Sequence, residues 1–277
     1  MEVRQASDSE SYQRKTTEEL RGAFVLDRLF VQGSISMVYC EQDRAIVGGA
    51  VPGNTSLQLL ATKKEMAAEF FAERREIGIV NIGDRGEVRA DGRVYPLGFK
   101  DMLYLGRGTK VVEFSSVRTD QPAGFYFVSY PAHTAHPSTL APSQTAEKST
   151  LGSPEAANRR TINRYIHSGG VKSCQLVMGL TDLDTGSVWN TMPPHTHMRR
   201  SEIYLYFGLD TESVVVHMMG KPRETRNLIL RNREAVVSPA WSIHCGAATK
   251  RYSFVWAMGG ENQEFSDMDA VGMQDLY

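Results

Sequence analysis

Short stretches of β-forming residues are the feature that most restricts the fold of this chain. Runs rich in Val, Ile, Tyr and Phe follow one another closely, and Gly, Asp or Pro interrupts them. Many short strands with few helices are typical of β-sandwiches and barrels. We therefore predict an all-β fold with a few short helices. The runs are EIGIVNIG, GRVYPLG, DMLYLG, GFYFVSY, VKSCQLVMGL, EIYLYF, SVVVHMMG, LILRNREAVVSP and RYSFVWAMGG.

Two segments predict the short helices. Thr16 and Glu19 have the spacing of a capping box directly before LRGAFVLDRLF. This spacing predicts a helix near the N-terminus. The run KKEMAAEFFAE predicts a second helix over residues 63–73.

An internal repeat links the two halves of the chain. RREIGIVNIG, which starts at Arg74, resembles RRSEIYLYFG, which starts at Arg199. Each string places an arginine pair before Glu-Ile and an apolar strand that ends in glycine. Under this alignment Glu76 corresponds to Glu202. Such a repeat predicts two barrels of common ancestry.

The stretch between the halves has a different composition. Residues 131–158 are rich in Pro, Ser, Thr and Ala, which is typical of a linker on the surface. We therefore predict an N-terminal barrel over residues 1–138. Residues 139–277 are predicted to form the linker and a C-terminal barrel.

Composition excludes several classes of protein. The 277 residues are 41% hydrophobic, enough for a substantial core, and the formal net charge of -1 disfavours a nucleic-acid partner. The three cysteines form no disulfide pattern, the N-terminal residues include no apolar signal region, and no apolar run suits a membrane span. We expect a protein of a reducing compartment, the cytoplasm, without a membrane partner.

Three histidines and one glutamate predict a metal site. Residues two apart share a face of a strand, so His195 and His197 can bind one ion. Glu202 lies an odd number of residues after His197, so a turn or bulge within residues 198–201 must restore the common face. His244 follows after enough chain for several strands and can return to the same wall. Three imidazoles and one carboxylate suit Zn, Mn, Fe, Co or Ni, and the residues alone do not choose among them.

The order of these residues resembles the motifs of the cupin superfamily. The first motif matches at His195, His197 and Glu202, and the second at His244. Three residues depart from the motifs: Gly186 lies too far upstream of the histidines, Trp241 replaces a glycine, and Ala248 replaces an asparagine. All four ligand positions remain intact. The resemblance implies a bicupin, two β-sandwich or jelly-roll barrels in one chain, of which the barrel in residues 139–277 binds the metal. When Glu76 is aligned with Glu202, residues such as Glu69, Phe70, Phe71 and Ala72 stand where the histidines should be, so the barrel in residues 1–138 is predicted to have no metal ligands.

Longer strings resemble one family more specifically, the 5-keto-4-deoxyuronate isomerases or 4-deoxy-L-threo-5-hexosulose-uronate ketol-isomerases. The strings are FFAERREIGIVNIG, NRRTINRYI, CQLVMGLTDLDTGSVWNTMPPHTHMRRSEIYLYF and SPAWSIHCGAATKRYSFVWAMGGENQEFSDMD. The resemblance implies one zinc ion per chain on the four residues named above, and a hexamer. It implies conversion of 5-dehydro-4-deoxy-D-glucuronate to 3-deoxy-D-glycero-2,5-hexodiulosonate in pectin breakdown. Cys245 stands where the family leads us to expect a serine.

The implied chemistry needs further residues beside the metal. A divalent ion can stabilise an enediolate, and a nearby group must move the proton. Strand alternation sends Tyr204 and Tyr206 to the same side as Glu202. The candidate catalytic residues are Tyr204, Tyr206, His217 and Glu261.

Arginine suits a substrate carboxylate because it can bind both oxygens. The candidates for substrate binding are Arg159, Arg160, Arg164, Arg199 and Arg200.

Two other functions remain open from the sequence. A cupin oxygenase or oxalate-type enzyme would use Fe or Mn at the same four residues, and its turnover would depend on oxygen or on a redox-active metal. A sugar-binding bicupin without catalysis would bind its ligand without turnover.

Overall fold

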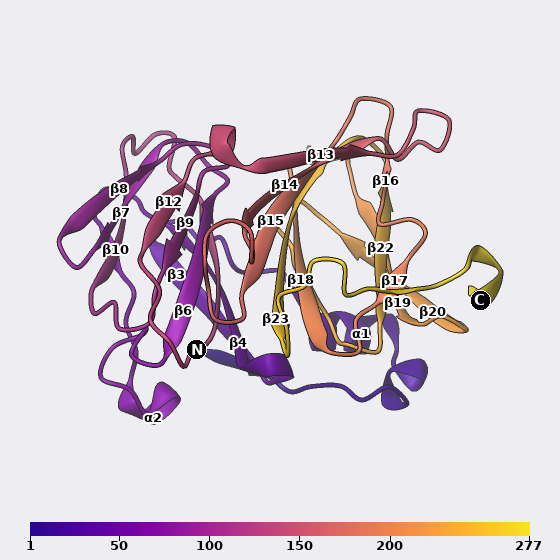
Figure 1. The fold of residues 1–277 in the computed structure, drawn as a ribbon, viewed down its shortest axis with the longest axis horizontal. Coiled ribbons are helices and arrows are strands. Elements are labelled where there is room, and N and C mark those ends of the chain that lie inside the picture. Colours follow the sequence, from indigo (N-terminus) through magenta and orange to yellow (C-terminus); the bar gives the residue numbers. More distant parts are fainter. The chain divides into compact units, whose positions relative to one another are not determined.

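Strands make up most of the regular structure, and the helices are few and short (Figure 1). The computed structural model describes residues 1–277. The prediction of an all-β fold with a few short helices is therefore confirmed. No helix combines the length and the apolar character that a membrane crossing would need. The helices are α1 (Thr17–Phe24), α2 (Lys63–Met66) and the 3-10 turns η1 (Ser11–Arg14), η2 (Gln42–Arg44), η3 (Ser143–Thr145) and η4 (Met273–Asp275).

Helix α1 begins at the predicted capping box. The Thr16 hydroxyl accepts a hydrogen bond from the backbone N–H of Glu19 at 3.3 Å, and the Glu19 carboxylate accepts one from the Thr16 N–H at 2.7 Å. The helix buries Leu20 and Phe24 and then continues as an extended strand at Val25.

The second predicted helix, over residues 63–73, is wrong beyond its first turn. Helix α2 ends at Met66 because Ala67 adopts a left-handed conformation with φ 48°. The chain then turns, and Phe71 and Ala72 enter the hydrophobic core. The apolar residues that suggested a helix serve this burial instead.

The chain forms two compact units that differ from the predicted division after residue 138. Residues 5–27 belong to the second unit, and residues 165–177 belong to the first. The first unit consists of Met1–Arg4, Arg28–Glu147 and Tyr165–Val177; the second consists of Gln5–Asp27, Lys148–Arg164 and Met178–Tyr277.

Specific contacts hold residues 5–27 in the second unit. The Tyr12 hydroxyl donates to the backbone carbonyl of Glu224 at 2.7 Å. The ring of Trp241 lies 4.8 Å from that of Tyr12 and 6.3 Å from that of Phe24. Trp241 replaces a motif glycine, and its indole packs against this N-terminal segment. The sequence alone gave no sign of this contact.

The first unit has one larger and one smaller sheet. The larger sheet has the order β1 (Glu2–Arg4), β3 (Ser34–Cys40), β4 (Ala45–Val51), β11 (Phe125–Pro131), β6 (Arg75–Asn81), β9 (Met102–Leu105) and β12 (Thr139–Ala141). The smaller sheet has the order β5 (Leu57–Gln58), β10 (Val112–Ser116), β7 (Gly86–Ala90) and β8 (Arg93–Leu97).

A second pair of sheets, formed mostly by residues of the second unit, repeats this arrangement. Its larger sheet has the order β13 (Glu147–Leu151), β14 (Arg160–Ile166), β15 (Val177–Leu183), β23 (Ser253–Gly260), β18 (Arg200–Phe207), β21 (Ala235–Ser238) and β2 (Val25–Leu26). Its smaller sheet has the order β16 (Trp189–Asn190), β22 (Ile243–Ala248), β19 (Val215–Lys221) and β20 (Glu224–Leu230), and a third sheet pairs β17 (His195–Thr196) with β24 (Asp269–Ala270). Counted along the chain, β3, β4, β6, β9 and β11 correspond to β14, β15, β18, β21 and β23 in the same sheet order. The predicted repeat is therefore confirmed at the level of topology.

Residues 131–158 do more than link the units. They include the edge strand β12, the turn η3 and the strand β13. The backbone of this segment thus pairs with sheet edges, a role that its Pro, Ser and Thr content concealed.

The interior of the first unit is filled by aromatic side chains. The Phe114 ring lies 5.2 Å from the Phe125 ring and 6.0 Å from the Phe127 ring. Aliphatic residues such as Ile77 and Ile79 complete this core. No cluster of potential metal ligands is found in this unit, whereas the second unit has one.

Candidate metal centre and pocket

The predicted turn brings His195, His197 and Glu202 to one wall. His195 lies in β17 and His197 directly after it, while Glu202 lies in β18. Between them the backbone N–H of Arg200 donates to the carbonyl of His197 at 3.2 Å, which closes a tight turn. This turn offsets the odd spacing, so that all three side chains converge. His244 joins them from β22.

The donor atoms of these four side chains lie within 4.8 Å of one another and could hold a metal ion. His195 Nε2 is 3.1 Å from the Nε2 atoms of both His197 and His244. Glu202 Oε2 is 3.0 Å from His197 Nε2 and 2.8 Å from His244 Nε2. Neighbouring donors around one ion lie about 3.0–3.5 Å apart when metal–ligand distances are about 2.1 Å. The cluster therefore fits a single divalent ion.

The protonation states also suit a metal. Burial lowers the pKa of His195 from 6.5 to about 2, and the adjacent His244 adds to the effect. Burial opposes ionisation of Glu202, but His244 and His197 outweigh it and hold the pKa of this carboxyl below its ordinary 4.5. Because His197 Nδ1 donates to the carbonyl oxygen of Asp267 at 2.7 Å, its Nε2 lone pair faces the cluster. A neutral imidazole and an ionised carboxylate are the forms that bind metals.

A pocket of about 430 Å³ opens beside the cluster. Three of the four side chains of the cluster line this pocket: His195, His197 and Glu202. Most of its wall is apolar. The aromatic and sulfur-containing side chains of this wall are Phe254, Trp256, Phe265, Met192, Met258 and Met268. The polar lining outside the cluster is provided by Arg160, Thr181, Thr191, Tyr204 and Ser266. Such a pocket suits a small molecule with few polar anchoring points.

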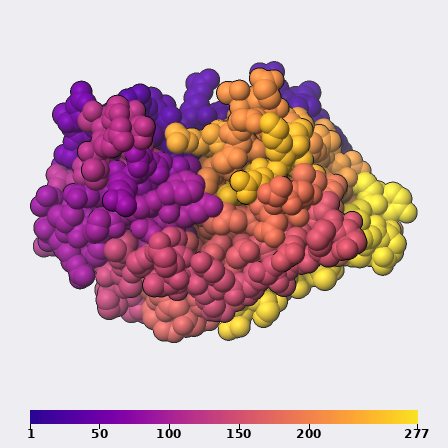
Figure 2. Space-filling model, turned by 90° about the horizontal axis from the view of Figure 1, so that it is seen from above, coloured from indigo at the N-terminus to yellow at the C-terminus, as the bar shows by residue number.

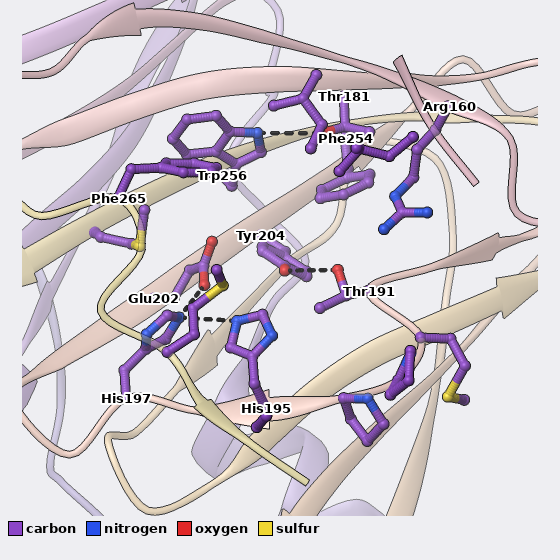
Figure 3. Close-up of a pocket in the computed structure, with 18 of the residues that line it drawn as sticks. Arg160, Thr181, Thr191, His195, His197, Glu202, Tyr204, Phe254, Trp256 and Phe265 are labelled. Carbon is purple, nitrogen blue, oxygen red and sulfur yellow. Dashed lines mark hydrogen bonds and ion pairs between the residues drawn. The ribbon is translucent and has the colours of Figure 1, made fainter. Parts of the chain in front are cut away.

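Arg160 provides the one cationic side chain of this lining. In the view of Figure 3 its guanidinium lies across the pocket from His195, His197 and Glu202. One N–H of its NH1 donates to the backbone carbonyl of Asn158 at 2.9 Å, and no acidic side chain pairs with it. A half-buried guanidinium with unused donors can bind an anionic group of a ligand.

Tyr204 lines the pocket next to the cluster. Its hydroxyl lies 3.1 Å from the Thr191 hydroxyl (Figure 3). Its ring is 5.4 Å from that of His244. Burial, reinforced by the charge of Glu202, raises the pKa of Tyr204 well above 10.0. The phenol therefore stays protonated and can donate a hydrogen bond.

The three other candidate catalytic residues do not line the pocket. Tyr206 faces inward, as alternation predicts, but its hydroxyl contacts His217 Nδ1 at 2.8 Å in the fully buried interior. Burial lowers the pKa of His217 to about 3. Glu261 is exposed after the end of β23. None of these residues can contact a molecule held in the pocket without rearrangement.

The other candidate arginines do not line the pocket, and each has protein partners. Arg159 pairs with Asp184 at 3.2 Å on the surface. Arg164 donates to the Ser149 hydroxyl at 2.8 Å. Arg199 and Arg200 contact residues 264–269, as described below.

The glutamate of the first unit does not match the glutamate of the cluster. Ile77 lies in the core, so alternation places Glu76 on the opposite face of β6. The Glu76 carboxylate accepts hydrogen bonds from the backbone N–H groups of residues 174–176 at 2.6 to 2.9 Å and from the Tyr104 hydroxyl at 2.8 Å. Glu202 instead faces the interior. The predicted correspondence is thus wrong by one strand position.

Several lining residues escaped the sequence analysis. Trp256 donates from its indole N–H to the Thr181 hydroxyl at 3.1 Å, and Phe265 packs 5.4 Å from the Trp256 ring. Trp256 and Phe254 alternate along β23, which pairs with β18. Their spacing of two residues places both side chains on one face of a strand. The sequence does not show that this face lines the pocket, because that depends on the pairing of β23 with β18.

Comparisons with known proteins give close relatives over the full length. A family model described as "KduI/IolB family" matches residues 27–273. A 4-deoxy-L-threo-5-hexosulose-uronate ketol-isomerase from Lachnoclostridium phytofermentans is 50% identical over 276 residues, which cover 100% of both chains. Proteins of the same name from Caldicellulosiruptor bescii and Shigella flexneri are 51% and 45% identical, again over 100% of both chains.

Solved structures share the fold at low sequence identity. An IolB-like protein from Salmonella typhimurium has a TM-score of 0.70 at 12% identity, over 90% of this chain and 96% of that one. An oxalate decarboxylase from Lactobacillus farciminis, in complex with formate, has a TM-score of 0.56 at 9% identity, over 83% and 79%. Identities this low show a common fold and nothing about a common activity.

Proposed function

The chain belongs to the KduI/IolB family, and from this premise we propose that it is a 4-deoxy-L-threo-5-hexosulose-uronate ketol-isomerase. It interconverts 5-dehydro-4-deoxy-D-glucuronate and 3-deoxy-D-glycero-2,5-hexodiulosonate. The single observation that carries the proposal is the sequence identity of 50% and 51%, over the full length of both chains, to relatives of that name. A pocket with a metal-type cluster on one side and Arg160 on the other supports it.

The substrate has two ends that suit the two sides of the pocket. Its name gives an aldehyde at C1 beside a hydroxyl at C2, and a carboxylate at C6. We place C1 and C2 next to the cluster and the carboxylate against Arg160, whose unused N–H donors can bind both carboxylate oxygens. The apolar wall of Trp256 and Phe254 then faces the carbon chain, which lacks a hydroxyl at C4.

The metal ligands in this proposal are His195, His197, Glu202 and His244, whose donor atoms lie close enough together to fit one ion. A bound divalent ion supplies Lewis-acid stabilisation of the negative charge that develops on the carbonyl oxygen. Three imidazoles and one carboxylate suit zinc, and we propose one Zn²⁺ per chain. The buried interior strengthens the electrostatic effect of every charge around the reacting atoms.

The reaction moves one proton between adjacent carbons and one between adjacent oxygens, with no net oxidation. We assign to Tyr204 the stabilisation of the substrate oxygen that becomes negatively charged. Its raised pKa keeps the hydroxyl protonated, and the hydroxyl lines the pocket beside Glu202. It therefore donates a hydrogen bond to an oxygen whose negative charge grows in the transition state. Thr191, 3.1 Å away, holds the phenol in this orientation.

The remaining parts of the proposal come from the family resemblance. We propose a homohexamer in the cytoplasm that works in the breakdown of pectin and related uronate polymers. The first unit, which has an aromatic core and no ligand cluster, then serves as a structural barrel of a bicupin. Metal analysis and light scattering test the zinc and the hexamer directly.

The activity is tested by an anaerobic NMR time course with freshly prepared 5-dehydro-4-deoxy-D-glucuronate. Wild type, a metal-stripped sample and His195→Ala are compared, and zinc is then returned to the stripped sample. We expect isomerised product from wild type and from the zinc-restored sample only. Unchanged substrate with metal bound would refute the isomerase. Turnover that requires oxygen would instead indicate an Fe or Mn oxygenase, and binding without turnover a sugar-binding protein.

A further inference from the structure

One wall of the pocket is a segment that follows the last long strand. We name residues 261–270 the pocket strap. Phe265, Ser266 and Met268 of the strap line the pocket, and its end, β24, pairs with β17 so that Ala270 lies opposite His195. C-terminal residues, in yellow, lie at the surface in Figure 2, and the strap alternates between exposed and partly buried residues. Its position therefore depends on specific anchors.

Arg200 anchors the strap through backbone carbonyls. Its NH1 donates to the carbonyl of Glu264 at 2.6 Å, and its NH2 donates to that of Asp267 at 3.1 Å. The side chain is 1% exposed, and no carboxylate forms a hydrogen bond with it. Burying a guanidinium costs its hydration, and these hydrogen bonds to carbonyl oxygens offset that cost.

Arg199 anchors the same segment through carboxylates. Its Nε lies 2.7 and 2.8 Å from the two carboxylate oxygens of Asp267, and its NH2 contacts Asp269 at 3.1 Å. The amide of Asn262 donates to the Asp267 carboxylate at 2.6 Å. Asp267 is thus held through both its side chain and its backbone.

The carbonyl of Asp267 connects the strap to the cluster. It accepts the hydrogen bond from His197 Nδ1 at 2.7 Å, and this bond fixes the tautomer and the orientation of the ring. Gly260 allows the close approach at the start of the strap, because a Cβ there would lie 2.5 Å from the Arg199 carbonyl oxygen and 2.6 Å from Arg200 Cα.

From these contacts we propose that Arg199 and Arg200 are positioning residues rather than substrate-binding residues. They hold the strap so that the Asp267 carbonyl orients His197 and so that Phe265 and Met268 close the pocket. The inference rests on the proposed function in one respect, the role of His197 as a metal ligand. In this proposal, the strap and its two arginines determine how tightly the cluster binds a metal ion.

The test measures zinc affinity of the whole chain by competition with a chromophoric chelator, independently of catalysis. The variants are Arg200→Lys and Asp267→Asn, of which the second keeps the backbone carbonyl and changes only a partly exposed side chain. We expect zinc to bind about 10- to 100-fold more weakly, as is typical when the partner of a metal-bound histidine is disturbed. A glutamate-specific protease should also cut after Glu264 faster than in wild type.

Arg75→Lys is the matched control. Arg75 is also a buried arginine that donates to backbone carbonyls, those of Arg44 at 2.6 Å and Ser129 at 2.8 Å, but it does not line the pocket. We expect it to lower thermal stability and to leave zinc affinity unchanged. Kinetics in saturating zinc separate the roles further, because a positioning residue changes kcat as well as KM.

Two results would overturn the inference. One is zinc affinity and proteolysis equal to wild type in both variants. The other is a raised KM with kcat and zinc affinity unchanged, which would mean that these arginines bind substrate. If wild type binds zinc but does not isomerise the substrate, the proposed function fails while the zinc and proteolysis measurements still decide the role of the strap.

Discussion

Replacement of Arg160 by glutamine removes the cationic group that we assign to the substrate carboxylate. The carboxylate is remote from the reacting carbons, so its hydrogen bonds should have equal strength in the ground state and in the transition state. Loss of such uniform binding raises KM and leaves kcat nearly unchanged. We therefore expect the effect of Arg160→Gln to appear mainly in KM.

The size of the effect follows from the environment of the guanidinium. Of its five N–H donors, one is used by the Asn158 carbonyl, so a fork remains for two carboxylate oxygens. A hydrogen bond between charged groups contributes about 1.5–3 kcal/mol, and Arg160 is half-buried, so a loss of about 3 kcal/mol is reasonable for the fork. This corresponds to a kcat/KM that is roughly 100-fold lower. Arg160→Lys keeps the charge without the fork and should lose roughly tenfold.

The assay is steady-state isomerisation over a range of substrate concentrations, with zinc affinity measured on the same samples. Arg159→Gln is the control, because Arg159 is the preceding residue but pairs with Asp184 outside the pocket. It should behave like wild type. Zinc affinity should be unchanged in all of these variants, which separates loss of substrate contact from loss of the cluster.

A KM for Arg160→Gln equal to that of wild type would refute the reasoning. An equally large effect from Arg159→Gln would refute it as well, because the effect could then not come from contact in the pocket. A selective loss of kcat would instead place Arg160 at the reacting atoms and reverse our orientation of the substrate.

Three further predictions concern the phenol, a buried histidine and the first helix. Tyr204→Phe should lower kcat by about 10²-fold or more with zinc affinity unchanged, because it removes only the hydrogen-bond donor to the charged oxygen; rates with and without added zinc check this. Burial lowers the pKa of His217 from 6.5 to about 3, so the unfolded chain takes up a proton below pH 6.5 that the folded chain does not. The contribution of His217 to stability is therefore full above pH 6.5 and falls by about 1.4 kcal/mol for each pH unit below it. In urea unfolding from pH 7 to 4, His217→Gln should reduce the slope of stability against pH by this amount, while other groups such as His195 keep their share. Thr16→Ala removes the capping box of α1 and should cost about 1 kcal/mol in the same assay, with wild-type kinetics.

Much of the candidate metal cluster could be predicted because its determinants are local. The His-x-His spacing fixes a common face on a strand, and parity requires a turn before Glu202, where the structure has one between His197 and Arg200. The capping box of α1 is equally local, since both of its hydrogen bonds join Thr16 and Glu19. Such features depend on a few neighbouring residues and on strand or helix geometry alone.

The roles of the arginines could not be predicted because they depend on partners far along the chain. Arg199 and Arg200 precede the cluster strand directly, yet their partners lie at residues 264–269. Arg160 lies farther from the ligands in sequence and nevertheless lines the pocket. From the sequence, all three residues are positively charged side chains near the ligands, and neither charge nor distance along the chain distinguishes their roles. The path of the strap decides the difference, because it uses most N–H donors of Arg199 and Arg200, whereas Arg160 spends one on Asn158 and keeps the rest available.

The two glutamates of the repeat show how little separates a correct topology from a wrong residue assignment. β6 and β18 occupy the same place in their sheets, so the repeat predicted the strands correctly. Side chains alternate along a strand, and a shift of one residue moves every side chain to the opposite face. RREI and RRSEI differ by one residue, Ser201, between the arginines and the glutamate. This residue places Glu202 on the inward face, whereas Glu76 faces away and binds backbone N–H groups. Two similar strings can therefore specify the same strand and opposite roles for its acid.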